Sequence, residues 1–171
     1  FRTGKLEVNG ALTQDELRPG QTRGYIFTTG QFDMPRDFLL RFGIQAASDE
    51  GYLLDYGHSA VDRLGNFVNF SRFREDFITL GRLTAYQGLL PDITTESTPP
   101  VLGNARFERR LRPELVGGLL RYGAEIEGHI RPFETGGTSR DVARIGLSGM
   151  WQDSYLFGAG VIAEADAGLT L

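Results

Sequence analysis

Residues 24–47, GYIFTTGQFDMPRDFLLRFGIQAA, predict two extended segments joined by a tight connection at residues 34–37. Side chains of a β-strand alternate between its two faces, so every second residue shares a face. In the second segment this puts an apolar row opposite a mixed, largely polar row. The apolar row has the length that a tilted strand needs to cross a bilayer core, roughly 9–11 residues. We expect Phe38, Leu40, Phe42 and Ile44 to face lipid, and Arg41 and Gln45 to face a polar lumen.

The same alternation recurs along the chain and is clearest in residues 115–131. There Leu120, Tyr122, Ile126 and Ile130 fall on an apolar face, and Arg121, Glu125, Glu127 and His129 on the polar face. Arg144 and Glu164 occupy polar positions in two later runs. The pattern predicts about nine strands. They span residues 4–14, 23–33, 38–47, 63–73, 77–87, 101–111, 115–131 and 141–151, with a last run that ends at 170.

The connections between these strands alternate in length. Four are longer, at 15–22, 48–62, 88–100 and 132–140, and four are shorter, at 34–37, 74–76, 112–114 and 152–155. Outer-membrane barrels have short periplasmic turns and longer extracellular loops, whereas a soluble sandwich has no reason to keep this order. The sequence therefore predicts an all-β, antiparallel up-and-down meander that is part of a large transmembrane outer-membrane β-barrel.

Composition limits the function classes. The chain has 171 residues, a net charge of −4 and no cysteine. No basic stripe is available for nucleic acid, and disulfides and cysteine-based metal sites are excluded. No apolar run reaches the roughly 18 residues of a transmembrane helix. Because the sequence starts and stops inside patterned stretches, we expect residues 1–171 to be a single barrel segment, incomplete at both ends.

Two sets of residues suggest catalysis. Glu125, Glu127 and His129, flanked by Arg121 and Arg131, share one strand face and could exchange protons with a substrate. His58, Ser59 and Asp62 hold the residue types of a serine hydrolase, but no G-x-S-x-G elbow accompanies them. We favour a charged lumen wall for the first set and an exposed loop for the second, and expect no enzyme.

Metal and cofactor sites are equally weak. Asp49, Glu50, Asp55 and Asp62 could offer oxygen ligands to Ca²⁺, but their spacing fits no EF-hand, so a solvated surface loop is favoured. No phosphate loop, zinc spacing or dinucleotide fingerprint is present. We therefore expect neither a metal nor a cofactor.

An aromatic group surrounds one predicted short turn. Trp151, Tyr155 and Phe157 could form part of an aromatic belt at a membrane interface, or could pack within the hairpin. The sequence leaves both interpretations open.

Four stretches in succession resemble one known family, the lipopolysaccharide-assembly proteins called LptD or organic solvent tolerance protein. The resemblance is to the barrel region, and is nearest to the alphaproteobacterial branch. The stretches are RGYIFTTGQFDMPRDFLLRFGIQAASDEGYLLDY at 23–56, DRL at 62–64, LTAYQGL at 83–89 and RDVARIGLSGMWQD at 140–153.

The resemblance implies a translocon rather than an enzyme. Proteins of this family join a periplasmic jellyroll to a very large barrel plugged by a lipoprotein, LptE. They receive lipopolysaccharide from periplasmic bridge proteins and insert it into the outer leaflet of a Gram-negative outer membrane. The family's interdomain disulfides have no counterpart in this cysteine-free chain, and no functional residue is carried across. Two alternatives stay open: another outer-membrane barrel, such as a porin-like channel or a transporter, and a soluble β-sandwich binding module.

Overall fold

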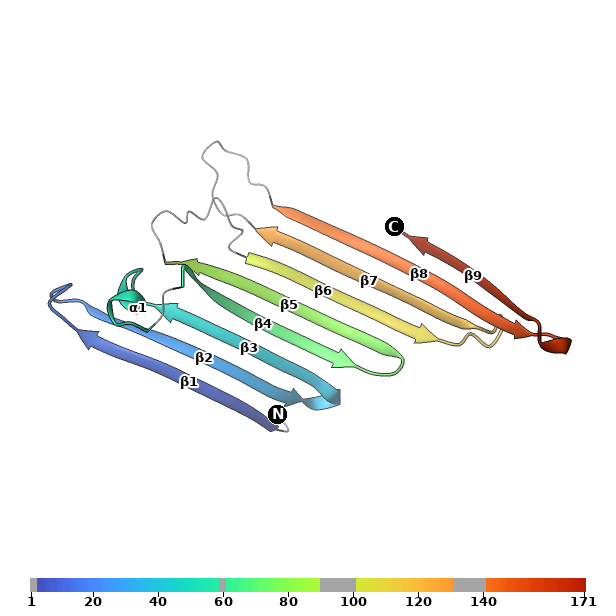
Figure 1. Ribbon diagram of the computed structural model, residues 1–171, viewed down its shortest axis with the longest axis horizontal. Coiled ribbons are helices and arrows are strands. Elements are labelled where there is room, and N and C mark those ends of the chain that lie inside the picture. Colours follow the sequence, from blue (N-terminus) through green and yellow to red (C-terminus); the bar gives the residue numbers. More distant parts are fainter. Residues whose placement is uncertain (1–2, 59–60, 90–100, 131–140) are drawn as a thin grey trace.

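The computed structural model describes residues 3–58, 61–89, 101–130 and 141–171. These residues form one antiparallel sheet of nine strands in the order of the sequence (Figure 1). This confirms the predicted all-β, up-and-down meander, and the sheet is open between its outer strands. The strands are β1 Thr3–Gln14, β2 Thr22–Met34, β3 Phe38–Ala47, β4 Arg63–Phe73, β5 Phe77–Gly88, β6 Val101–Leu111, β7 Leu119–Ile130, β8 Val142–Leu156 and β9 Ile162–Thr170.

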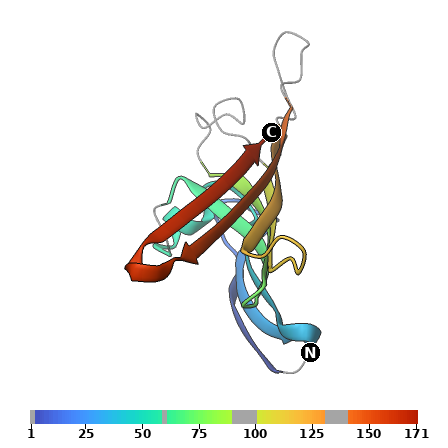
Figure 2. The ribbon, with the colours of Figure 1, turned by 90° about the vertical axis from the view of Figure 1, so that its right-hand side faces the viewer.

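The sheet is a single, strongly twisted layer. Seen from the side, β8 and β9 run at a large angle to β1 and β2 (Figure 2), as expected from the right-handed twist of strands. The described residues contain no second sheet that could cover either face. Within the same residues, none of the helices has the length and apolar character needed to cross a membrane.

Two predicted boundaries are wrong. The predicted strand 115–131 begins only at Leu119, because Gly117 and Gly118 have φ values of 65° and 70°, which turn the chain. The predicted turn at 152–155 lies instead at 157–161, around the 3-10 segment η2 Gly158–Gly160. Residues 152–156 extend β8, because they keep the alternation and pair with β9.

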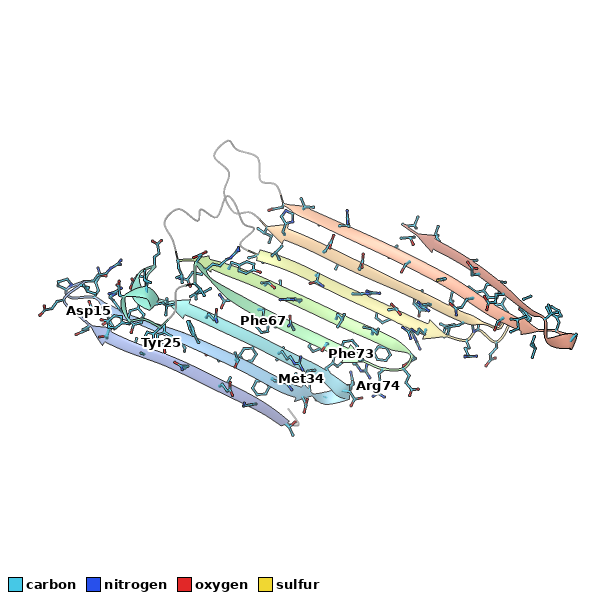
Figure 3. All side chains as sticks on the ribbon, in the orientation of Figure 1. Asp15, Tyr25, Met34, Phe67, Phe73 and Arg74 are labelled. Atoms are coloured by element: carbon cyan, nitrogen blue, oxygen red, sulfur yellow. The ribbon has the colours of Figure 1, made fainter. Side chains whose placement is uncertain are left out.

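The connections gather at two edges of the sheet. The turn edge carries 35–37, which includes the 3-10 segment η1 Pro35–Asp37, and also 74–76, 112–118 and 157–161. The loop edge carries 15–21 and the described part of 48–62, and it is also where β5 and β7 end and β6 and β8 begin. Figure 3 shows Met34, Phe73 and Arg74 at the turn edge, and Asp15 and Tyr25 at the loop edge. Arg74 forms an ion pair with Asp37, which ties two neighbouring turns together.

β3 and β4 separate towards the loop edge. Their backbone pairing covers only Leu39–Gly43 and Phe67–Ser71, and Figure 1 shows the two strands diverging beyond it. In that region, side-chain hydrogen bonds take the place of backbone hydrogen bonds between the two strands. The Asn66 Oδ1 atom accepts a hydrogen bond from the backbone N–H of Gln45 at 2.6 Å, and the Gln45 Oε1 atom accepts one from Gly65 at 3.2 Å. We call this region the β3–β4 split.

A small core closes over the split at the loop edge. The helical turn α1 Tyr52–Asp55 brings Tyr52 and Leu53 against Leu64 and Leu89, and all four side chains are buried. Tyr25, Phe27 and Ala47 from β2 and β3 pack around them. The sequence did not predict α1, because a single helical turn has too few residues to show a helical period.

Candidate functional site

Strand register divides the residues of the sheet into two faces. Leu40 pairs with Phe32 and Phe70, and the same row continues through Gly81 and Ala105 to Ile126 on β7. Side chains of directly paired residues lie on the same side of a sheet. The apolar rows of β3 and β7, predicted independently, therefore share one face, which we call the apolar face. The opposite one is the polar face.

Charge is distributed very unequally between these faces. Among the described residues of the nine strands, the apolar face carries three charged side chains, Arg72, Arg109 and Asp153. All three lie close to the turn edge. The other charged strand residues, from Lys5 on β1 to Asp166 on β9, lie on the polar face. Among these described strand residues, no charged side chain lies on the middle or the loop side of the apolar face.

The predicted site residues follow this division. The lipid-facing candidates Phe38, Leu40, Phe42, Ile44, Leu120, Tyr122, Ile126 and Ile130 all lie on the apolar face. The lumen-facing candidates Arg41, Gln45, Arg121, Glu125, Glu127, His129, Arg144 and Glu164 all lie on the polar face. Contact of one face with lipid and of the other with a lumen stays a prediction.

Aromatic side chains of the apolar face concentrate towards the turn edge. The Phe38 and Phe70 rings stack with their centroids 4.5 Å apart. The guanidinium of Arg72 lies 5.0 Å from the Phe38 ring centroid and 4.4 Å from that of Phe77. Such rings shield the stem of an arginine while its charged end reaches towards water. Phe32, Phe107, Tyr122, Trp151 and Tyr155 belong to the same half of this face.

Of the three aromatic residues predicted near the last turn, Trp151 makes a specific contact. Its Nε1–H donates a hydrogen bond to the Gly117 carbonyl oxygen at 3.0 Å, so it fastens a neighbouring turn. Tyr155 lies on the apolar face, and Phe157 is exposed in the turn itself. An interfacial role for them stays a prediction.

On the polar face, four predicted residues line one hollow of about 660 Å³. Glu125, Glu127, His129 and Arg144 meet there, and Arg144 Nη1 lies 3.4 Å from Glu127 Oε1. The other predicted residues lie elsewhere: Arg41 and Gln45 on β3, Arg121 opposite Arg110, and Glu164 beside Asp166 in a second hollow. Arg131, also considered for acid–base work, lies outside the described residues. The geometry is that of a charged wall.

β6 carries a charged triplet that is not among the residues predicted from the sequence. Glu108 lies between Arg106 and Arg110 on the polar face, with side-chain nitrogen–oxygen distances of 3.0 and 3.2 Å. The signal was present, because residues two apart on a strand share a face. Glu108 neutralises part of the positive charge of this strand.

A buried arginine beneath the loop that follows β3 is also absent from the residues predicted from the sequence. Arg23 on β2 is 2% exposed and reaches three carboxylates. Its Nε lies 2.9 Å from Asp49 Oδ2, its Nη2 2.7 Å from Asp55 Oδ2, and its Nη1 3.2 Å from Asp15 Oδ2. The rings of Tyr52 and Tyr56 lie 5.4 and 5.9 Å from the guanidinium carbon. We call this group the Arg23 cluster.

The Arg23 cluster changes the interpretation of the acidic loop. Asp49 and Asp55, considered as Ca²⁺ ligands or solvated surface residues, bind an arginine instead. Hydrogen bonds from Arg23 hold the pKa of Asp49 well below its ordinary value. The hydroxyl of Tyr56 lowers the pKa of Asp15, and the same bond raises the pKa of Tyr56. The described residues contain no group of three metal-binding side chains.

The hydrolase set is not assembled by any observed contact. His58 is exposed, with its ring 4.7 Å from that of Tyr25, and Asp62 is also exposed. Ser59 lies outside the described residues. The candidate site is thus a surface property, one apolar and one charged face of a single sheet. A scan against models of known protein families and searches of curated proteins and of solved structures find no match to this chain.

Proposed function

We propose that this chain is a segment of the wall of an outer-membrane β-barrel of LptD type, which inserts lipopolysaccharide into the outer leaflet. In this proposal the apolar face contacts membrane lipid, and the polar face lines an aqueous lumen. The observation that carries it is that, among the described strand residues, the charged side chains of the apolar face all lie near the turn edge.

The energetics of charge in a bilayer support this orientation. A lysine or arginine on the lipid face of a barrel costs about 2–4 kcal/mol at the midplane and about 0–1 kcal/mol near the interfaces. Arg72 and Arg109 lie near the turn edge, where the cost is small, and Arg72 is flanked by aromatic rings. Aromatic residues are enriched at membrane interfaces. The turn edge would then lie at the periplasmic interface.

Exposure of the apolar face disfavours the soluble sandwich. Leu6, Ile126 and Ile145 are 54, 48 and 68% exposed, and no second sheet covers them in the part of the chain that the structure describes. A large uncovered apolar surface marks a contact with a partner or with a membrane. A sheet face that runs the length of nine strands fits hydrocarbon better than a local partner.

The choice of the LptD family over another barrel rests on the resemblance of four ordered stretches. The same resemblance supplies the proposed partners: lipopolysaccharide, an LptE-like lipoprotein, periplasmic bridge proteins and outer-membrane lipid. Transport of an amphiphile needs a hydrated polar surface along the lumen and no covalent step, so we propose no enzymatic activity.

Depletion of the full-length protein in its own bacterium tests this function. We expect newly made lipopolysaccharide to become inaccessible to a non-permeant antibody on intact cells, while an unrelated outer-membrane protein stays accessible. A porin-like channel would instead conduct ions in planar bilayers, and its depletion would leave surface lipopolysaccharide unchanged. That second pattern would overturn the proposal.

A further inference from the structure

The polar face of β3, β4 and β5 is basic, although the chain as a whole is acidic. These three strands place Arg41, Arg63 and Arg82 on the polar face and no carboxylate. The net charge of the chain is −4, so this surface differs in sign from the average. Neutral hydrogen-bonding side chains surround the arginines on the same strands: Gln45, Asn69, Ser71, Thr84 and Tyr86.

Arg41 and Arg82 lie in one row across the sheet. Arg41 on β3 pairs with Asn69 on β4, and Asn69 pairs with Arg82 on β5. Neighbouring strands lie about 4.8 Å apart, so the two arginine backbones are separated by about 10 Å. An extended arginine side chain is longer than half of that separation. If Arg41 turns from Gln31 on β2 towards β4, both guanidinium groups can reach one ligand above the shorter side chain of Asn69.

Each of these arginines is oriented by a neutral partner. Arg41 donates from Nε to Gln31 Oε1 at 3.0 Å, and Arg82 donates from Nε to Thr84 Oγ1 at 3.2 Å. These bonds leave the terminal guanidinium nitrogens to other partners. No carboxylate among the described residues forms an ion pair with either arginine.

Four other arginines of the polar face differ in this respect. Arg106 and Arg110 share Glu108, Arg144 contacts Glu127, and Arg23 is held by Asp49. If the arginines served only to keep the polar face hydrated, we would expect carboxylates beside those of β3 to β5 as well. Arg41, Arg63 and Arg82 thus lack a counter-charge in these fully described strands, and of the three only Arg41 and Arg82 share a row, because Arg63 lies over the Tyr86 ring at the loop edge.

We propose that Arg41 and Arg82, with Asn69 between them, bind a phosphate group on the polar face. A guanidinium presents paired N–H donors that match two oxygens of a phosphate. Two guanidinium groups placed on either side of one site suit a tetrahedral oxyanion better than a planar carboxylate, which a single guanidinium already satisfies. The assignment rests on the proposed function for its setting, a lumen that phosphorylated amphiphiles cross.

The test is a binding measurement on the full-length protein in neutral detergent micelles. Inorganic phosphate is titrated by isothermal calorimetry, in parallel with a single-chain lipid that carries a phosphate monoester. We expect Arg41→Gln/Arg82→Gln to weaken binding by about tenfold or more, because the hydrogen bonds from both guanidinium groups to the phosphate are lost. Asn69→Asp places a carboxylate between two intact arginines, and we expect the same loss.

Matched controls separate this site from general charge. Arg36→Gln/Arg112→Gln removes two exposed arginines from the turn edge and should leave binding within about twofold, because distant exposed charges are screened. Arg41→Lys/Arg82→Lys keeps the charge but not the fork, and should bind with intermediate strength. Unchanged heat-modifiable gel mobility shows which variants are folded.

Each outcome decides between the alternatives. Equal affinity for both probes identifies a site for phosphate itself, and preference for the lipid identifies a headgroup site. Loss of binding in the control pair, or its retention in both the glutamine pair and Asn69→Asp, overturns the assignment. So does a parent protein that binds neither probe. Because the measurement needs no lipopolysaccharide transport, its failure is distinct from failure of the translocon proposal.

Discussion

Arg23 on β2 and Asp49 in the loop after β3 form a two-point ion pair, with Nε 2.9 Å from Oδ2 and Nη2 2.8 Å from Oδ1. Arg23 is almost fully buried, and the Asp49 side chain is 11% exposed. The pair therefore ties a connection of the loop edge down onto the polar face. In the proposed barrel, this loop would narrow the outer mouth of the lumen.

Asp49→Asn should loosen this loop. A buried ion pair that loses one partner leaves the other charge uncompensated, so the closed arrangement is disfavoured. We expect the backbone amides of Asp55 and His58, which are hydrogen-bonded within the loop, to exchange with deuterium about tenfold faster or more. Glu50→Gln removes an exposed carboxylate from the same loop and should change neither rate. Equal effects of the two substitutions would contradict the role of Arg23.

Acid should open the same loop. The pKa of Asp49 is lower in the folded protein than its ordinary value of 3.8, so its stabilising contribution is complete above that value and is lost progressively as the pH falls below it. Asp15 shifts in the same direction. The ¹⁹F signal of fluorotyrosine at Tyr52 should stay constant from neutral pH to about pH 5 and move below about pH 4. In Asp49→Asn that acid transition should be much smaller.

The orientation of the sheet predicts opposite tolerance at two adjacent residues. Phe42 lies on the apolar face, with its ring centroid 6.0 Å from that of Phe32, and Arg41 lies on the polar face. In the full-length protein, Phe42→Arg should block membrane assembly, because a midplane arginine costs about 2–4 kcal/mol. Arg41→Ala and Phe42→Leu should assemble normally. Heat-modifiable gel mobility measures assembly. If Phe42→Arg and Arg41→Ala were tolerated equally, this would count against a sheet whose apolar face contacts lipid and whose polar face lines the lumen.

The β3–β4 split predicts two residue-specific effects. Gln45→Leu removes the acceptor of the Gly65 amide, and Asn66→Leu removes the acceptor of the amide of residue 45. An amide left without its partner exchanges faster and costs about 1–3 kcal/mol where it is buried. Gln45→Leu should therefore speed exchange at Gly65, and Asn66→Leu at Gln45. If each substitution raised the exchange rates of both amides equally, the two side-chain hydrogen bonds would not act independently.

The sequence by itself determined the strands and their two faces. Residues 38–47 and 63–73 are strands with the predicted bounds, because alternation with period two is a local property of a strand. The same alternation predicted which side of each strand carries Phe42 or Arg41. Where it failed, at Leu115–Gly118 and at 152–155, residues with positive φ form the observed turns: Gly117 and Gly118 in the first, and Ala159 and Gly160 in the second.

Tertiary structure alone decided which residues of different strands meet. Register joined Arg41, Asn69 and Arg82 in one row, and no pattern within a single strand contains that information. It also brought Arg23 to Asp49, Asp55 and Asp15 from three separate segments. The physical reason is that the sheet face of a side chain depends only on its position within its own strand. Which residues pair depends on the register between neighbouring strands and on how each loop packs.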